Sequence, residues 1–234
     1  MLTGKRVIIV GGSAGIGLKI AEQLTMAGAK PIIVGRTSEK ITMAQKKLTS
    51  DTTVYQLDAS NEEHVISFFE EIGPFDHLIS TIKHPHVSGK FGTSTTAELK
   101  QAFDIKFWGQ HNLVMHGLKH INPEGSFILT SGIASRRSYP GFSSTAAING
   151  AIESLVKSLS AEIAPLRINA VCPGFIERFS DDKQRLVTVN NLGARLPLER
   201  LGSQNETASA YLFLLQNRYA TGSIIDIDGG ELCS

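Results

Sequence analysis

The chain has 234 residues, and its 23 Lys and Arg residues against 22 Asp and Glu residues give a formal net charge of +1. This charge argues against binding to nucleic acid or to an anionic membrane, because neither partner would be attracted electrostatically. A hydrophobic fraction of 41% is enough for a buried core, in one large domain or two small ones. No apolar run is long enough to span a bilayer, and no secretory signal is visible.

Short β-branched runs alternate with longer amphipathic stretches along the chain. In chain order, we predict strands at Arg6–Val10, Pro31–Gly35, Thr53–Asp58, His77–Thr81, Ser126–Ser131, Arg167–Cys172 and Ser223–Asp228. Helices are expected between them, for example over Ile16–Ala27, where apolar residues recur on one stripe. This alternation predicts the α/β class: a single doubly wound (Rossmann) domain over residues 1–234, with a seven-stranded parallel sheet and helices on both faces.

Two segments lack this regular pattern. One is Lys83–Thr96, which contains His84 and His86, and the other is Phe175–Gly202. Ligands bind at the carboxyl ends of the strands in such sheets, so both segments are candidates for covering a substrate. Lys83, His84 and His86 then become candidate substrate contacts, with solvent-facing loop residues as the alternative.

Cysteine and histidine positions indicate the compartment and the metal content. Cys172 and Cys233 are too far apart in sequence to suggest a disulfide framework or a metal cluster. Two isolated thiols are typical of a reducing compartment, so we expect a cytoplasmic protein. His116 and His120 are four residues apart on a predicted helix, a spacing that can hold a metal, but no third ligand is apparent. We therefore predict no metal site.

The first predicted strand leads into Gly11-Gly12-Ser13-Ala14-Gly15-Ile16-Gly17 and then into a helix. In this context Gly11 suits a tight turn, Gly15 lets the backbone approach a diphosphate, and Gly17 allows close packing of helix and strand. The N-terminus of the helix directs free N–H groups at the phosphates. The pattern predicts a dinucleotide site, and a glycine-rich turn without a ligand is the alternative.

Arg36 follows the second predicted strand, where an acidic residue would accept a hydrogen bond from a ribose 2′-hydroxyl and repel a 2′-phosphate. An arginine favours the 2′-phosphate, and Thr37 and Ser38 add hydroxyl donors. We therefore expect NADP(H) rather than NAD(H), with a solvated loop arginine as the alternative.

Several motifs in this order resemble the short-chain dehydrogenase/reductase family over nearly the whole chain. They are the glycine spacing Gly11-x3-Gly15-x-Gly17, the pair Asp58-Ala59, the run from Asn169 to Ile176, and the run from Gly222 to Gly230. The resemblance implies a nicotinamide cofactor that contacts Asp58 and Ala59 with its adenine. The full set of predicted cofactor-binding residues is Gly11, Ser13, Ala14, Gly15, Ile16, Gly17, Arg36, Thr37, Ser38, Asp58, Ala59, Thr81, Pro173, Gly174 and Ile176.

The family's usual catalytic residues are an asparagine, a serine and a Tyr-x-x-x-Lys pair. None of the four tyrosines here has a lysine four positions later. Aligning the motifs places Lys106 at the asparagine position, Gly132 next to Ser131 at the serine position, Thr145 at the tyrosine position and Asn149 at the lysine position. The family's Asn-Asn-Ala-Gly segment reads Ser80-Thr81-Ile82-Lys83. All four catalytic positions are therefore changed.

Substitutes for the missing acid follow from the chemistry of these residues. Lys106 could donate a proton near neutrality if it is buried, because burial lowers the pKa of a lysine; an ion-paired or solvent-facing lysine is the alternative. Ser131 could polarise a substrate oxygen, or only satisfy backbone groups at the strand end. Thr145 is far less acidic than a phenol but could donate a hydrogen bond to a carbonyl, and Asn149 could hold the nicotinamide ribose.

These observations predict an NADP(H)-dependent oxidoreductase that acts on a small carbonyl or alcohol substrate through a non-standard site. The alternative is a non-catalytic NADP(H)-binding sensor, or a structural partner of an active relative. The small side chains of Ala146–Ala151 allow close helix packing, so we expect a homodimer or homotetramer; packing inside one chain is the alternative.

Overall fold

The computed structural model describes residues 2–49, 52–84, 91–177 and 191–234. Parallel strands form one seven-stranded sheet in the order β3-β2-β1-β4-β5-β6-β7, which confirms the predicted fold class. The order reverses between β1 and β4, and sheets of this type bind ligands at that switch point. The strands are β1 (Arg6–Val10), β2 (Lys30–Gly35), β3 (Thr53–Gln56), β4 (Phe75–Ser80), β5 (Ile121–Thr130), β6 (Arg167–Pro173) and β7 (Ile224–Ile227).

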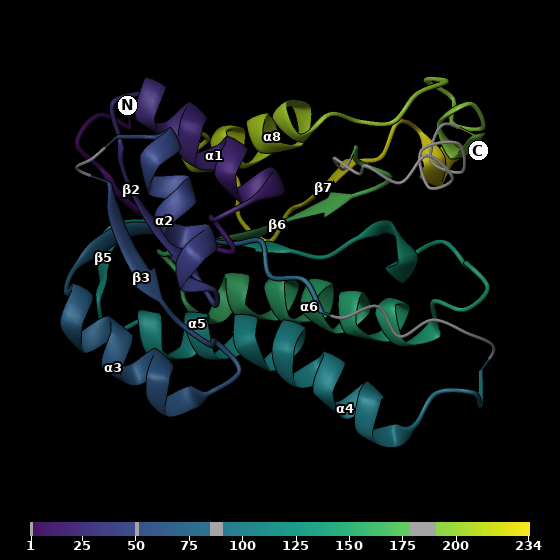
Figure 1. The fold of residues 1–234 in the computed structure, drawn as a ribbon, viewed down its shortest axis with the longest axis horizontal. Helices are drawn as coiled ribbons and strands as arrows, with labels where there is room; N and C mark the ends of the chain where they lie inside the picture. The colour runs from purple at the N-terminus through teal and green to yellow at the C-terminus, as the bar shows by residue number, and fades with distance from the viewer. Residues whose placement is uncertain (1, 50–51, 85–90, 178–190) are drawn as a thin grey trace.

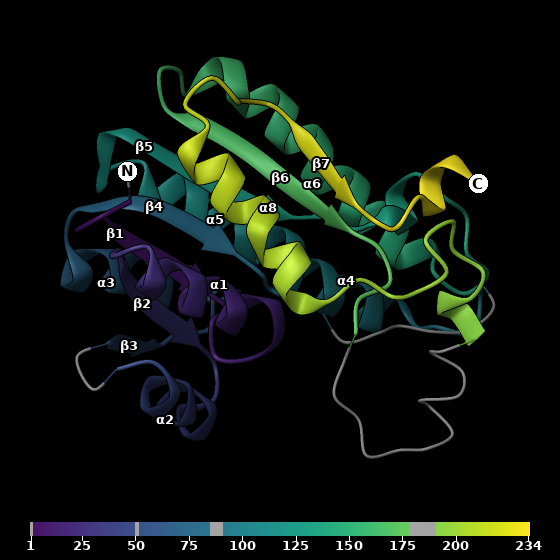
Figure 2. The ribbon, with the colours of Figure 1, turned by 90° about the horizontal axis from the view of Figure 1, so that it is seen from above.

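Helices cover both faces of the sheet (Figures 1 and 2). One face carries α1 (Gly15–Met26), α2 (Ser38–Lys47) and α8 (Gln204–Gln216). The other carries α3 (Glu62–Ile72), α4 (Thr96–Phe103), α5 (Gly109–Gly117) and α6 (Ser143–Glu162). Three shorter turns are η1 (Asp104–Trp108), η2 (Ile133–Ser135) and η3 (Glu231–Cys233). Of these, η1 is a π-helical turn that joins α4 to α5.

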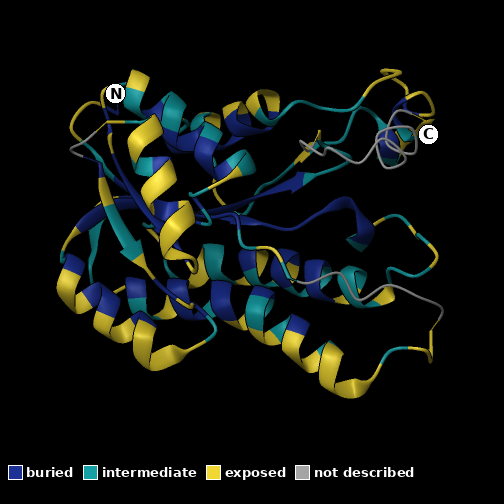
Figure 3. Cartoon of the chain, viewed as in Figure 1, coloured by how far each residue is buried: buried dark blue, intermediate teal, exposed yellow. Residues whose placement is uncertain are grey.

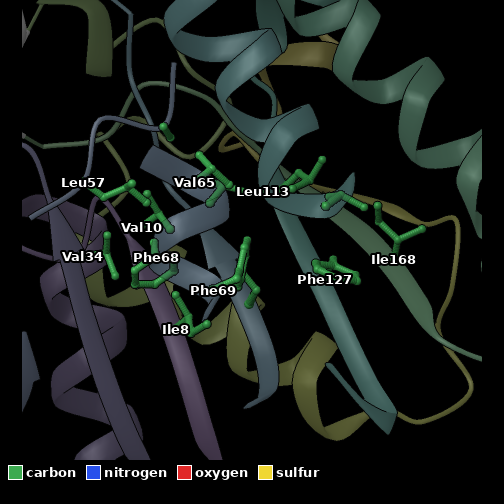
Figure 4. Packing of buried hydrophobic residues seen from close by; sticks show 14 of the residues in the cluster. Ile8, Val10, Val34, Leu57, Val65, Phe68, Phe69, Leu113, Phe127 and Ile168 are labelled. Atoms are coloured by element: carbon green, nitrogen blue, oxygen red, sulfur yellow. The ribbon is translucent and has the colours of Figure 1, made fainter. Parts of the chain in front are cut away.

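Each face of the sheet has its own hydrophobic core. Successive strand residues point to opposite faces of the sheet. The uninterrupted apolar run at the end of β1 therefore contributes side chains to both cores. Ile8 packs with Phe68 and Phe69 of α3 on one side, as Figure 4 shows. Val7 on the other side shares a cluster with Ile20 of α1. Figure 3 shows the resulting pattern of buried strands and exposed outer helix faces.

The predicted strands are all present, but several ends differ. β5 begins at Ile121 rather than Ser126, because Ile121 pairs with Phe75 before an irregularity in the register. β3 ends at Gln56 rather than Asp58. The Asp58 carboxylate instead accepts hydrogen bonds from the backbone N–H and the hydroxyl of Ser60, at 3.1 and 2.6 Å, and so forms a turn.

The prediction that His116 and His120 share a helix is wrong. α5 ends at Gly117, because the chain turns there toward β5. His116 contacts Glu62 at 2.8 Å, whereas the ring of His120 stacks on Phe69. In the described part of the chain, no group of three or more His, Cys, Asp or Glu residues is placed to hold a metal ion. No helix among the same residues has the length and apolar composition needed to cross a membrane.

Candidate cofactor and catalytic site

The glycine-rich loop joins β1 to α1 beside the end of β4. Cβ atoms at Gly11 and Gly17 would lie 2.6 and 2.7 Å from the hydroxyl oxygen of Thr81, so neither position has room for a side chain. Gly15 differs: it has a φ of +57°, and among the described residues the nearest atom to its Cβ position is Nζ of Lys83, at 3.8 Å. The loop is therefore closely packed at Gly11 and Gly17 and open at Gly15.

Backbone and side-chain contacts hold this loop to the neighbouring strands. Thr81 donates from its N–H and its hydroxyl to the Val10 carbonyl, at 2.8 and 3.2 Å. Ser13 packs against the end of β2, where a Cβ on Gly35 would lie 3.1 Å from the Ser13 hydroxyl oxygen. No side chain caps α1 at Ala14, so the N–H groups of its first turn, from Gly15 onward, can bind an anion.

Residues after β2 and β3 extend the same edge of the sheet. The exposed Arg36 follows β2, and its carbonyl accepts a 3.0 Å hydrogen bond from Gln56 Nε2. Thr37 precedes α2 and makes no side-chain capping bond, while Ser38 is the first residue of the helix. Ala59 is buried, next to the exposed Asp58. The predicted adenine and 2′-phosphate contacts thus lie at adjacent strand ends.

The third group of predicted cofactor residues follows β6. The N–H of Gly174 donates to Ile227 at 2.9 Å, and a Cβ on Gly174 would lie 2.7 Å from Asp228 Cα. Ile176 forms a parallel bridge with Gly202. Of the predicted substrate-covering segment, residues 178–190 lie outside the described residues, and His86 does too.

Lys106 lies in the π-helical turn η1 and is buried, with 7% of its surface exposed. Its ammonium donates to Oδ1 of Asn149 at 2.7 Å and to the carbonyl of Ser131 at 3.0 Å. Burial and, to a lesser extent, the positive charge of Lys83 lower the pKa of Lys106 from 10.5 to about 8. Lys106 is thus a buried lysine that is mostly protonated at neutral pH and half-protonated near a pH of about 8. The π-helical turn that holds it is a feature often found at functional sites.

Asn149 lies on α6, and both the oxygen and the nitrogen of its side-chain amide form hydrogen bonds within the protein. Its Oδ1 accepts from Lys106, and its Nδ2 donates to the Gly132 carbonyl at 3.1 Å. A Cβ on Gly132 would lie 2.9 Å from that nitrogen, so a serine there would displace Asn149. The Asn149 amide is thus paired with Lys106 and Gly132, and its contact with the nicotinamide ribose stays a prediction.

Ser131 is 3% exposed, and its two polar groups serve different neighbours. Its carbonyl accepts from Lys106, whereas its hydroxyl donates to Oε1 of Glu153 at 3.0 Å. Ser135 donates to the same oxygen at 2.7 Å, and Arg136 lies 3.4 Å from the other carboxylate oxygen. The Ser131 hydroxyl thus donates to the Glu153 carboxylate, and its contact with a substrate oxygen stays a prediction.

Thr145 lies in the first turn of α6 and is partly exposed. Its hydroxyl oxygen is 3.4 Å from Nε2 of His84, so the residue at the predicted tyrosine position meets an imidazole. This contact brings the chain that leaves β4 against the start of α6. Thr145 and Lys106 both border the carboxyl edge of the sheet.

A match to a known family covers these motifs. The family model described as enoyl-(acyl carrier protein) reductase matches residues 10–231 of this chain. The chain belongs to the short-chain dehydrogenase/reductase family. The resemblance seen in the sequence is thereby confirmed, and with it membership of a family of oxidoreductases.

Individual relatives of this short-chain dehydrogenase/reductase match it end to end. A short-chain dehydrogenase/reductase of Gibberella fujikuroi is 26% identical over 255 residues, which cover 100% of this chain and 96% of that protein. The mouse 3-oxoacyl-[acyl-carrier-protein] reductase is 28% identical over 229 residues, which cover 95% of each protein. A crystal structure of a small-chain dehydrogenase in complex with NADPH is 34% identical, with a TM-score of 0.86 and coverage of 99% of this chain and 100% of that chain.

Two residues beside the predicted site of this short-chain dehydrogenase/reductase, Glu153 and Arg136, are absent from the sequence-based set of site residues. Glu153 receives three side chains, and Arg136 bridges it to Asp226 through a 2.9 Å hydrogen bond. The available signal was a carboxylate four positions after Asn149, on the same helix face. Cys172 adjoins this network, and burial raises the pKa of its thiol to about 12, against the effect of Arg136.

Proposed function

We propose that this protein is an NADP(H)-dependent oxidoreductase that interconverts a carbonyl and an alcohol, with Lys106 as the proton donor. The observation that carries the proposal is the buried Lys106 ammonium, held by Asn149 and Ser131 at the carboxyl edge of the sheet. A group whose pKa is about 8 can give and regain a proton near neutral pH.

Three features support NADP(H) as the cofactor. The glycine-rich loop leaves space beside Gly15 at the start of α1, where a diphosphate would bind. The exposed Arg36 is suited to the 2′-phosphate, and a structural neighbour with 34% identity was solved with NADPH. When bound, the nicotinamide supplies the hydride.

Reduction of a carbonyl requires one hydride at carbon and one proton at oxygen, and the product is an alcohol. The Lys106 ammonium gives its proton to the oxygen and becomes a neutral amine. That amine keeps two N–H groups, which match its two acceptors, Asn149 and the Ser131 carbonyl. A proton from solvent then restores the ammonium. Thr145 orients the substrate oxygen by donating a hydrogen bond.

The substrates to test first are small ketones, enones and 3-oxoacyl thioesters, since one relative is named a 3-oxoacyl-[acyl-carrier-protein] reductase. We expect loss of NADPH absorbance with at least one of them. The variants Lys106→Met and Thr145→Val should lower the rate, by about 10²–10⁴-fold for Lys106 because a positioned acid is removed. Unchanged melting temperature and NADPH affinity in both variants would locate the loss in the chemical step. Normal turnover in both would remove these residues from the mechanism.

The second candidate is a non-catalytic NADP(H)-binding sensor, or a structural partner of an active relative. The absence of any Tyr-x-x-x-Lys in the sequence favours it. This candidate predicts tight cofactor binding without turnover of any substrate in the panel, together with a change of shape or partner on binding. A homodimer or homotetramer is proposed under either function, and α6 offers an open position at Gly150 for close packing.

A further inference from the structure

Lys83 occupies the turn between the glycine-rich loop and the catalytic residues. The segment that contains it leaves β4 through Thr81, which is bonded to the end of β1, and reaches His84, which contacts Thr145 on α6. Lys83 is exposed, so a ligand can reach its ammonium. The ammonium of Lys83 therefore lies near the carboxyl ends of β1 and β4, where the strand order of the sheet reverses.

The end of the Lys83 side chain lies at the one open glycine of the loop. Its Nζ is 3.8 Å from the position that a Cβ on Gly15 would take, whereas the positions at Gly11 and Gly17 are filled by the protein's own atoms. Gly15 is also the first residue of α1, and the residue before it, Ala14, makes no side-chain capping bond to the first turn. The Lys83 ammonium and the N–H groups at the start of α1 thus border the same small space, and this combination suits a phosphate group.

We propose that Lys83 binds the diphosphate of the NADP(H) cofactor, closing the glycine-rich loop over it from the β4 side. The inference rests on the cofactor assigned in the proposed function and adds a cation to it. A lysine acts on phosphate as a flexible point charge, so it can follow the diphosphate without a fixed geometry. Lys83 is then a binding residue for the cofactor and not part of the proton transfer.

The test compares two ligands in calorimetric titrations of the wild type and Lys83→Met. NADP⁺ carries both the diphosphate and the 2′-phosphate, whereas adenosine 2′-monophosphate carries only the latter. Lys83→Met should weaken NADP⁺ binding about tenfold at low salt, and less at high salt because of screening. Binding of adenosine 2′-monophosphate, measured by competition, should not change. Lys83→Arg should restore NADP⁺ binding.

Lys119→Met is the matched control. It removes the same charge from an exposed residue just before β5, at the opposite edge of the sheet, and should leave both affinities unchanged. Equal NADP⁺ affinity in Lys83→Met and wild type would overturn the inference, as would an equal loss for both ligands. Failure of the wild type to bind either ligand would instead overturn the cofactor in the proposed function.

Discussion

The glycine-rich loop and the Lys106 cluster, which consists of Lys106, Ser131 and Asn149, both lie at the carboxyl edge of the sheet, yet they are formed differently. Gly11, Gly15 and Gly17 lie close together in the sequence, at the end of β1 and the start of α1, although Gly11 and Gly17 also pack against Thr81. Lys106 and Asn149 stand 43 positions apart and meet through the packing of η1 against α6. The loop residues are thus neighbours in the sequence, whereas the residues of the cluster are brought together only by the fold.

This difference determines how each region tolerates change. The loop depends on the absence of side chains at Gly11 and Gly17, where an added Cβ would meet Thr81, and on the positive φ of Gly15. The cluster depends on matched partners, because a buried ammonium needs acceptors and a buried amide needs both a donor and an acceptor. A change to one partner should therefore be corrected by a change to the other.

The largest expected effect comes from Asn149→Lys. The substitution places a second ammonium beside the buried Lys106 with no added anion, and an uncompensated buried charge costs about 3–5 kcal/mol. Exchanging both residues, as Lys106→Asn with Asn149→Lys, restores one ammonium and one amide. The double variant should recover most of the free energy of unfolding, measured by chemical denaturation.

Lys106→Asn alone completes this cycle. It leaves the Ser131 carbonyl without its Lys106 donor, and a buried unpaired group costs about 1–3 kcal/mol. If the double variant were destabilised by the sum of the two single changes, Lys106 and Asn149 would not act as a pair.

A smaller effect is expected from alanine substitutions in the glycine-rich loop, and it should differ between Gly17 and Gly15. Gly17→Ala brings a Cβ to 2.7 Å from the Thr81 hydroxyl, and closer still to the Gly11 carbonyl, so it should cost about 1–3 kcal/mol of stability as well as cofactor binding. Gly15→Ala meets only Lys83 Nζ and should cost about 1 kcal/mol through its positive φ. Thermal melts and NADPH titrations of both variants measure this. A greater loss of melting temperature in Gly15→Ala would contradict the packing assigned to Gly17.

The smallest expected effect is the change of reduction rate and of stability with pH. In the proposed mechanism the proton donor is the ammonium form of Lys106, so the rate of reduction should fall as the pH rises past about 8. Stability should move the opposite way. The folded pKa of Lys106 lies below the unfolded value of 10.5, so the unfolded chain binds more protons between pH 8 and 10.5, and stability rises with pH there.

The variant Lys106→Met isolates the contribution of Lys106 to the pH dependence of stability, because every other titrating group is retained. The difference in unfolding free energy between wild type and variant should change across that pH interval and stay flat below it. A difference that is flat throughout would mean that Lys106 keeps an ordinary pKa in the folded protein.

Much of the architecture follows from the residues alone. Alternating apolar runs and amphipathic stretches predict the parallel α/β sheet, since strand and helix periodicities are local properties of the chain. The positions of Gly11, Gly15 and Gly17 after β1 likewise predict the cofactor loop. Strand ends are less well predicted: β5 starts at Ile121 because of its pairing with Phe75, which no local pattern contains.

The Lys106 cluster, by contrast, is formed only by the tertiary structure. The sequence identifies Lys106, Ser131 and Asn149 as unusual residues, but not that one ammonium joins all three. Nor does it show that Glu153 receives the Ser131 hydroxyl, which changes the role available to that serine. Burial, and with it the lowered pKa of Lys106, arises only when η1, the end of β5 and α6 pack together. A lysine at the surface and a buried lysine look the same in the sequence. Their pKa values differ because of the surrounding fold.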